Sequence, residues 1–276
     1  MAYKRESLEE LDVMNNYLMN RLATDPEVGE SFGRLLIKGL LGLEVRSVKI
    51  LAERVVIPDD PKKRGVRLDI EVDELDDKGL VAKIFDIEPH RGNDMDFPKA
   101  MRYRQAQIDK GLLKSGEKDF SKLPRLYIIS ITNFDPFGYN KMVYSVKNMC
   151  REVPDLCYND GVEIFYFNTA GTEGGEKTLK NFLDYLEDSR STNVNDPQTK
   201  EMETYVSHVK GHSGGDYMTV GDWVDSIVAD AVADAVAEKD SALAEKDSAL
   251  AEKDRQIAEL LARLESVSGK SVKNDT

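Results

Sequence analysis

The segment VRLDIEVDELDDKGLVAKIFDIEPH, residues 66–90, decides how the chain around it must fold. In its first part, apolar residues alternate strictly with charged ones, which is typical of a β-strand with one buried face. Asp76-Asp77-Lys78-Gly79 then indicates a turn. A second strand follows, from Leu80 to Glu88. The segment therefore predicts an antiparallel strand pair.

Acidic residues gather on this strand pair. A tight turn brings Asp69 to the neighbourhood of Asp86 and Glu88, and a one-residue bulge would shift this pairing slightly. Because side chains alternate between faces, Asp86, Glu88 and His90 share one face, as do Arg67 and Asp69. Carboxylates this close repel one another unless a proton, a cation or a basic group intervenes. The pattern predicts a site for Mg²⁺, a cation that prefers oxygen ligands; an ordinary solvent-facing strand has the same alternation.

The flanking segments predict an α/β chain. Predicted helices cover residues 7–23, a stretch after Asp25-Pro26 that ends at Gly42, residues 97–113 and residues 178–186. Further predicted strands cover residues 45–56, 126–131 and 163–167. This order favours helices packed on a mixed sheet.

The composition excludes several classes of protein. The chain has 276 residues and a net charge of −13, which argues against a broad basic face for nucleic acid. No run of 18 apolar residues occurs and the N-terminus lacks an apolar signal segment, so we expect a cytoplasmic protein with no membrane partner. Cys150 and Cys157 fit no usual zinc spacing and are expected to be reduced thiols.

The C-terminal part differs in composition. EKDSALA occurs twice, at 238–244 and 245–251, and apolar residues recur every seventh position within 236–264. This predicts a C-terminal helix over 221–268 that forms a coiled coil and a homodimer or other homo-oligomer through 236–264; a single solvated helix is the alternative. Residues 189–220 are predicted as a linker and 269–276 as a disordered tail. His208 and His212, four residues apart in this linker, indicate either a zinc site or a plain connector.

Four stretches together resemble a known family. They are GVRLDIEV, FDIEPHR, FPKAMRYRQAQIDKGLL and LPRLYIISITNFDPFG. Their order resembles the PD-(D/E)XK nuclease superfamily, and more narrowly the bacterial recombination-promoting nuclease and transposase-like family. The likeness spans about Asp12 to Leu186. It implies a restriction-endonuclease-like core over residues 1–188, with a mixed central sheet flanked by helices.

The resemblance also implies a metal centre. Asp69 and Glu88 match the family's metal ligands, and the backbone carbonyl of Pro89 would be a third ligand for Mg²⁺, with Mn²⁺ as a substitute. His90 stands where the family has Gln or Lys. A protonated His could stabilise charge on the attacked phosphate, and a neutral one could hydrogen-bond a water, but the departure also fits a weakened or degenerate site.

Three supporting residues follow from the same resemblance. Gln105 would support the site from its helix, and Arg102 would contact phosphate, unless it is simply a solvated helix residue. Glu30 matches a position where the superfamily often supplies another acid; a first-turn acid favoured by the helix dipole is the alternative. The expected function is a metal-dependent DNA endonuclease linked to recombination or mobile-element processing. The alternative is a catalytically degenerate member that binds DNA or protein and assembles through its coiled coil.

Overall fold

The computed structural model describes residues 8–56, 66–92, 96–113, 116–212 and 253. The heptad segment 236–264 lies outside these residues except for Lys253, so the coiled coil and the homodimer stay predictions. No helix within the described residues is both long and apolar enough to cross a membrane.

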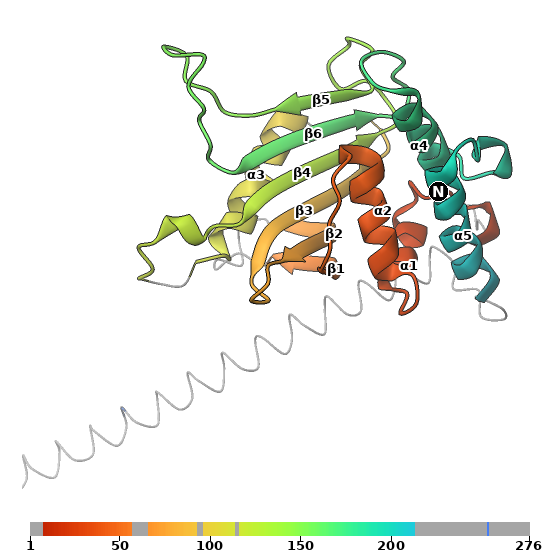
Figure 1. The fold of residues 1–276 in the computed structure, drawn as a ribbon, viewed down its shortest axis with the longest axis horizontal. Helices are drawn as coiled ribbons and strands as arrows, with labels where there is room; N and C mark the ends of the chain where they lie inside the picture. Colours follow the sequence, from red (N-terminus) through yellow and green to blue (C-terminus); the bar gives the residue numbers. More distant parts are fainter. Residues whose placement is uncertain (1–7, 57–65, 93–95, 114–115, 213–252, 254–276) are drawn as a thin grey trace, which may run out of the picture. The chain divides into compact units, whose positions relative to one another are not determined.

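A six-stranded mixed sheet forms the centre of the described chain (Figure 1). Its strands are β1 (Val48–Val56), β2 (Val66–Leu75), β3 (Val81–His90), β4 (Arg125–Thr132), β5 (Val143–Val146) and β6 (Val162–Asn168). The strand order is β1-β2-β3-β4-β6-β5. The β3–β4 and β4–β6 pairs are parallel, whereas the other pairs are antiparallel. This confirms the predicted mixed sheet flanked by helices.

Helices cover both faces of the sheet. On one face lie α1 (Asn16–Thr24), α2 (Gly29–Leu41), α4 (Lys177–Glu187) and α5 (Pro197–His212), as Figure 1 shows. Gly33 of α2 approaches Ile50 of β1 and Val72 of β2, so α2 packs on the face to which these two side chains point. The core between these helices and the sheet is apolar and fully buried at Phe32, Leu36 and other positions.

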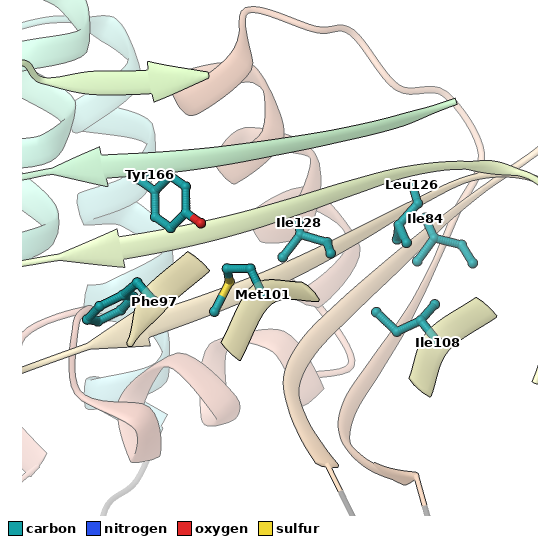
Figure 2. Close-up of a cluster of buried hydrophobic side chains, with 7 residues drawn as sticks. All are labelled: Ile84, Phe97, Met101, Ile108, Leu126, Ile128 and Tyr166. Carbon is teal, nitrogen blue, oxygen red and sulfur yellow. The ribbon is translucent and has the colours of Figure 1, made fainter. Parts of the chain in front are cut away.

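The opposite face is covered by α3 (Phe97–Lys110). Buried side chains of this helix pack on β3, β4 and β6, as Figure 2 shows. The cluster consists of Ile84, Phe97, Met101, Ile108, Leu126, Ile128 and Tyr166. We call this side of the sheet the α3 face. Because strand side chains alternate, Asp86 and Glu88 lie on the same side of β3 as Ile84 and therefore on the α3 face.

Two predicted elements differ from the structure. The helix predicted over 7–23 is a short 3-10 turn at Leu8–Glu10 followed by α1, which begins at Asn16. The side chain of Asn15 accepts the Tyr17 N–H and so caps a new helix in the middle of the apolar pattern. The linker predicted over 189–220 is wrong for its described part, because α5 forms there and buries Met202, Val206 and Val209. The short strand β5 was not predicted.

The contact between α2 and α4 gives a first prediction on stability. A Cβ atom on Gly39 would lie 2.4–2.7 Å from ring carbons of Phe182, which is fully buried. We expect Gly39→Ala to lower the free energy of unfolding by about 1–3 kcal/mol, because a packed ring must move. Urea denaturation measures this. Gly211→Ala on α5 is the control, since no atom lies within 4 Å of its Cβ position and the substitution should be neutral or mildly stabilising. Equal stability of the two variants would contradict the prediction.

Candidate functional site

Strands β2 and β3 bring Asp69 and Glu88 together. The strands pair from Leu75–Val81 to Ile70–Ile87, with a shift in register at Glu74/Leu75. Beyond Ile70 the backbone N–H of Asp69 donates to the carboxylate Oε1 of Glu88 at 3.0 Å. A side chain therefore takes the place of a strand carbonyl as the acceptor.

The acidic side chains on the α3 face are buried, which is rare for carboxylates unless they are paired. Glu71, Asp73, Asp86 and Glu88 are exposed by 0%, 6%, 0% and 1%. Glu71 and Asp86 are direct cross-strand partners. Asp69 is half-buried. Burying several carboxylates in one place is costly unless protons, a cation or basic groups compensate their charge.

Arg104 of α3 supplies positive charge to this group. Its Nη2 atom lies 2.5 Å from Oε2 of Glu88, and its Nε atom lies 3.6 Å from Oδ2 of Asp86. The Arg104 side chain is only 12% exposed. We name Asp69, Glu71, Asp86, Glu88 and Arg104 the acid cluster.

Burial dominates the electrostatics of the cluster. It is the largest of the causes that raise the pKa of Asp86 to about 7; the nearby Glu71 and Asp69 carboxylates act in the same direction, and Arg104 and a hydrogen bond with Glu88 oppose the shift. Burial, together with Asp86 and Asp69, likewise raises the pKa of Glu88 well above its ordinary value, again against Arg104. Near neutral pH the Asp86–Glu88 pair therefore has a strong tendency to hold a proton. A divalent cation would relieve the same repulsion.

The end of β3 carries His90, beside an aromatic group. The His90 ring meets Phe97 edge-on with centroids 5.3 Å apart, and Phe97 packs against Phe134 at 5.4 Å. His90 is half-buried and lies on the α3 face, like Glu88 two residues before it. The preceding residue, Pro89, is buried within β3. The imidazole thus packs on α3 at the end of β3, two residues beyond Glu88.

The loop Asn133–Gly138 has a clear architectural role. The carboxylate of Asp135 accepts hydrogen bonds from the backbone N–H groups of Phe137, Gly138 and Asn140 and from the Tyr144 hydroxyl. Although burial acts to raise the pKa of Asp135, these donors lower it below its ordinary value. The NFDPFG motif thereby places Phe134 against Phe97 and Phe137 against Tyr166.

The predicted supporting residues lie apart from the acid cluster or face elsewhere. Arg102 is exposed on α3. Gln105 is half-buried and donates to Asp109 at 3.4 Å. Glu30 lies on α2, on the other face of the sheet, and pairs with Arg34 at 2.8 Å. The alternatives for Arg102 and Glu30, a solvated helix residue and a first-turn acid, agree better with these positions.

Arg104 was missed from the sequence, although a signal existed. Met101, Arg104 and Ile108 recur at steps of three and four, so they share the buried side of α3. An arginine on the apolar side of a helix indicates a buried acidic partner. The neighbouring Arg102 was predicted as a phosphate contact because it matches the family motif, but it stands on the exposed side of the helix.

The acidic side chains could bind magnesium only through one or two carboxylates, with water and phosphate as the other ligands. Among the described residues, no group of three or more His, Cys, Asp or Glu side chains is arranged to hold a metal ion. Mg²⁺ in proteins often takes one or two carboxylates and fills its other positions with water and phosphate oxygens. Asp69 and Glu88 are two carboxylate residues of the kind this requires, and the 3.0 Å hydrogen bond from the Asp69 backbone N–H holds Glu88 next to Asp69.

Within the part of the chain that the structure describes, no group of three or more His, Cys, Asp or Glu side chains around His208 is arranged to hold zinc. His208 of α5 points toward the α1–α2 turn, with Nε2 3.5 Å from Asp25 and 3.7 Å from Glu27. The side chain of His212 lies outside the described part. Cys150 and Cys157 are both free thiols.

The chain was compared with family models, with curated proteins and with solved structures, and no match was found in any of the three.

Proposed function

We propose that the chain is a metal-dependent endonuclease with a restriction-endonuclease-like core that hydrolyses phosphodiester bonds in DNA. One observation carries the proposal: carboxylates are buried together where β2 and β3 stop pairing, although burial strongly penalises their charge. On an ordinary strand pair that faces solvent, acids at the positions of Glu71, Asp86 and Glu88 would be exposed. Such an arrangement is costly to the fold, and its natural use is to bind a cation. By its family resemblance the activity would serve recombination or mobile-element processing.

Each residue has a role in this proposal. Asp69 and Glu88, with the backbone carbonyl of Pro89, would hold Mg²⁺ or Mn²⁺, which polarises a phosphoryl group and supplies hydroxide near neutral pH. The Asp69 N–H fixes one oxygen of Glu88 and so orients its carboxylate. His90, held against Phe97, would hydrogen-bond the attacking water or the phosphate. Helix α3, whose Arg104 contacts Glu88, covers the side of the sheet on which the acids are buried.

Cleavage of supercoiled plasmid by the full-length protein tests the proposal. We expect nicking that requires Mg²⁺ or Mn²⁺ and stops with EDTA, and we expect Asp69→Ala to reduce it at least about 100-fold. Asp77→Ala in the exposed turn of the same hairpin is the matched control and should cleave like the wild type. Absence of cleavage with every divalent metal between pH 6 and 9, or full activity of Asp69→Ala, would refute the proposal.

A second candidate is a non-catalytic module that binds DNA or protein with the same fold. The ion pair between Arg104 and Glu88 favours it, because a guanidinium already neutralises the central carboxylate. Measuring binding and cleavage on the same proteins distinguishes the two candidates. A binding module shifts duplex DNA, or a partner protein, in a mobility assay without cutting any plasmid, and Asp69→Ala leaves that binding unchanged.

A further inference from the structure

We infer that Arg104 is an internal competitor of the divalent cation: its guanidinium occupies the Asp86–Glu88 pair when no metal is bound and must leave Glu88 for the metal to bind. The inference rests on the proposed metal site. It adds a positioning residue to which the resemblance assigns no role and which sets the affinity for the metal.

The geometry makes the two cations mutually exclusive. One oxygen of Glu88 accepts the Asp69 N–H at 3.0 Å, and the other accepts Arg104 Nη2 at 2.5 Å. A metal bound to Glu88 needs one of these oxygens. A metal on Oε1 would have to share that oxygen with the Asp69 N–H, so Oε2 is the oxygen at which the metal and Arg104 compete. Two positive charges in contact with one buried carboxylate oxygen would repel strongly.

The poor compensation of the fully buried Asp86 supports a state in which a metal ion replaces Arg104. Apart from the neighbouring Glu88 carboxyl, no described residue gives the Asp86 carboxylate oxygens a hydrogen bond, and Arg104 Nε lies 3.6 Å from Oδ2. Buried carboxylates usually have closer and better-aligned donors. Asp86 is therefore only partly compensated by Arg104, and it leaves capacity for a more highly charged ion on the same side of β3.

Arg104 can leave the pair without disturbing the helix. Its side chain is 12% exposed, whereas those of Asp86 and Glu88 are 0% and 2% exposed, so the guanidinium lies on the solvent side of the carboxylates. The adjoining residues Arg102 and Tyr103 are exposed, which places open surface next to the Arg104 side chain. Rotation about its own side-chain bonds suffices, because long side chains change rotamer readily near a surface.

Metal affinity measured directly tests the inference. Mn²⁺ binding to the full-length protein at pH 8, followed by electron paramagnetic resonance of free Mn²⁺, should be at least about tenfold tighter in Arg104→Met than in the wild type, because the competing cation is gone. Lys110→Met removes one positive charge from an exposed position of the same helix and is the control. Its affinity should equal that of the wild type. Equal or weaker Mn²⁺ binding by Arg104→Met would overturn the inference.

Two further measurements test the inference even if the Arg104→Met protein does not fold. Arg104→Lys keeps a charge but loses the two-pronged contact, so its Mn²⁺ affinity should lie between those of wild type and Arg104→Met. In the wild type itself, the Arg104 Nε–H resonance should shift on addition of Mg²⁺; an unchanged resonance at saturating Mg²⁺ would also overturn the inference.

The outcomes separate this inference from the proposed function. If the wild type cleaves plasmid with Mg²⁺ and Arg104→Met binds Mn²⁺ no better, the nuclease stands and the competition is wrong. If neither protein binds Mn²⁺ and the wild type cuts no DNA, the proposed function itself is wrong.

Discussion

Glu88→Gln should reduce metal-dependent DNA cleavage at least about 100-fold while leaving the protein folded. The amide has nearly the shape of the carboxylate, and its oxygen can still accept the Asp69 N–H. It carries no negative charge, so it is a poor ligand for Mg²⁺. Burial already raises the pKa of Glu88 well above its ordinary value, which favours a neutral side chain, whereas the amide loses the ion pair with Arg104. The loss is therefore expected mainly in activity, with a smaller loss of stability from the broken ion pair.

Rates of plasmid nicking and the temperature of unfolding, measured on the same preparations, check this separation. Glu74→Gln is the matched control, because Glu74 lies on β2 of the same hairpin and pairs with Lys83 at 2.6 Å on the other face of the sheet. It should cut at nearly the wild-type rate. A Glu88→Gln protein that is folded and cuts as fast as Glu74→Gln would exclude Glu88 as a metal ligand.

Asp86→Asn should make the protein more stable at pH 8 and lessen the pH dependence of its stability between pH 4 and 8, with Glu88 supplying the part that remains. Burial raises the pKa of Asp86 to about 7 in the folded state, from 3.8 for an unperturbed Asp. The folded state therefore binds a proton more tightly than the unfolded chain does. The stabilisation from this proton is fully present below the unfolded pKa and is lost as pH rises through about 7.

Thermal unfolding with EDTA, at steps from pH 5 to pH 8, measures this effect. The wild type should lose stability over that range, whereas Asp86→Asn should lose less and melt several degrees higher at pH 8, since a 1 kcal/mol change shifts the midpoint of a domain of this size by roughly 2–4 °C. Asp77→Asn, in the exposed turn, should follow the wild type. Parallel pH profiles for wild type and Asp86→Asn would show that Asp86 is ionised in the folded protein throughout.

The approach of Asp69 to Glu88 could be predicted because it depends on local rules. Strict period-two alternation and one turn signal suffice to pair two strands, and the bulge at Glu74/Leu75 alters the register only near the turn. The mixed sheet followed from the same patterns in later segments. The burial of Glu71 and Asp73 could not be predicted, because a polar strand face looks the same whether water or a helix covers it.

The remaining differences have tertiary causes. The contact of Arg104 with Glu88 depends on how α3 is rotated over the sheet, which no spacing within β2 and β3 determines. Helix α5 follows a polar segment typical of a loop, and its buried Met202, Val206 and Val209 need the surfaces of α1, α2 and α4 to pack against. Glu30 does not lie in the acid cluster because its helix, α2, packs on the opposite side of the sheet.

The bulge near the hairpin tip has a practical consequence for labelling the protein. It separates the exposed turn from the paired stretch in which Val72 and Phe85 anchor the register by burial. The turn closes on itself, since the Asp76 side chain accepts the N–H groups of Lys78 and Leu80. Asp77→Cys at its exposed tip, in a chain whose free Cys150 and Cys157 are replaced by serine, can therefore carry a fluorophore without disturbing the acid cluster at the far end of the same two strands.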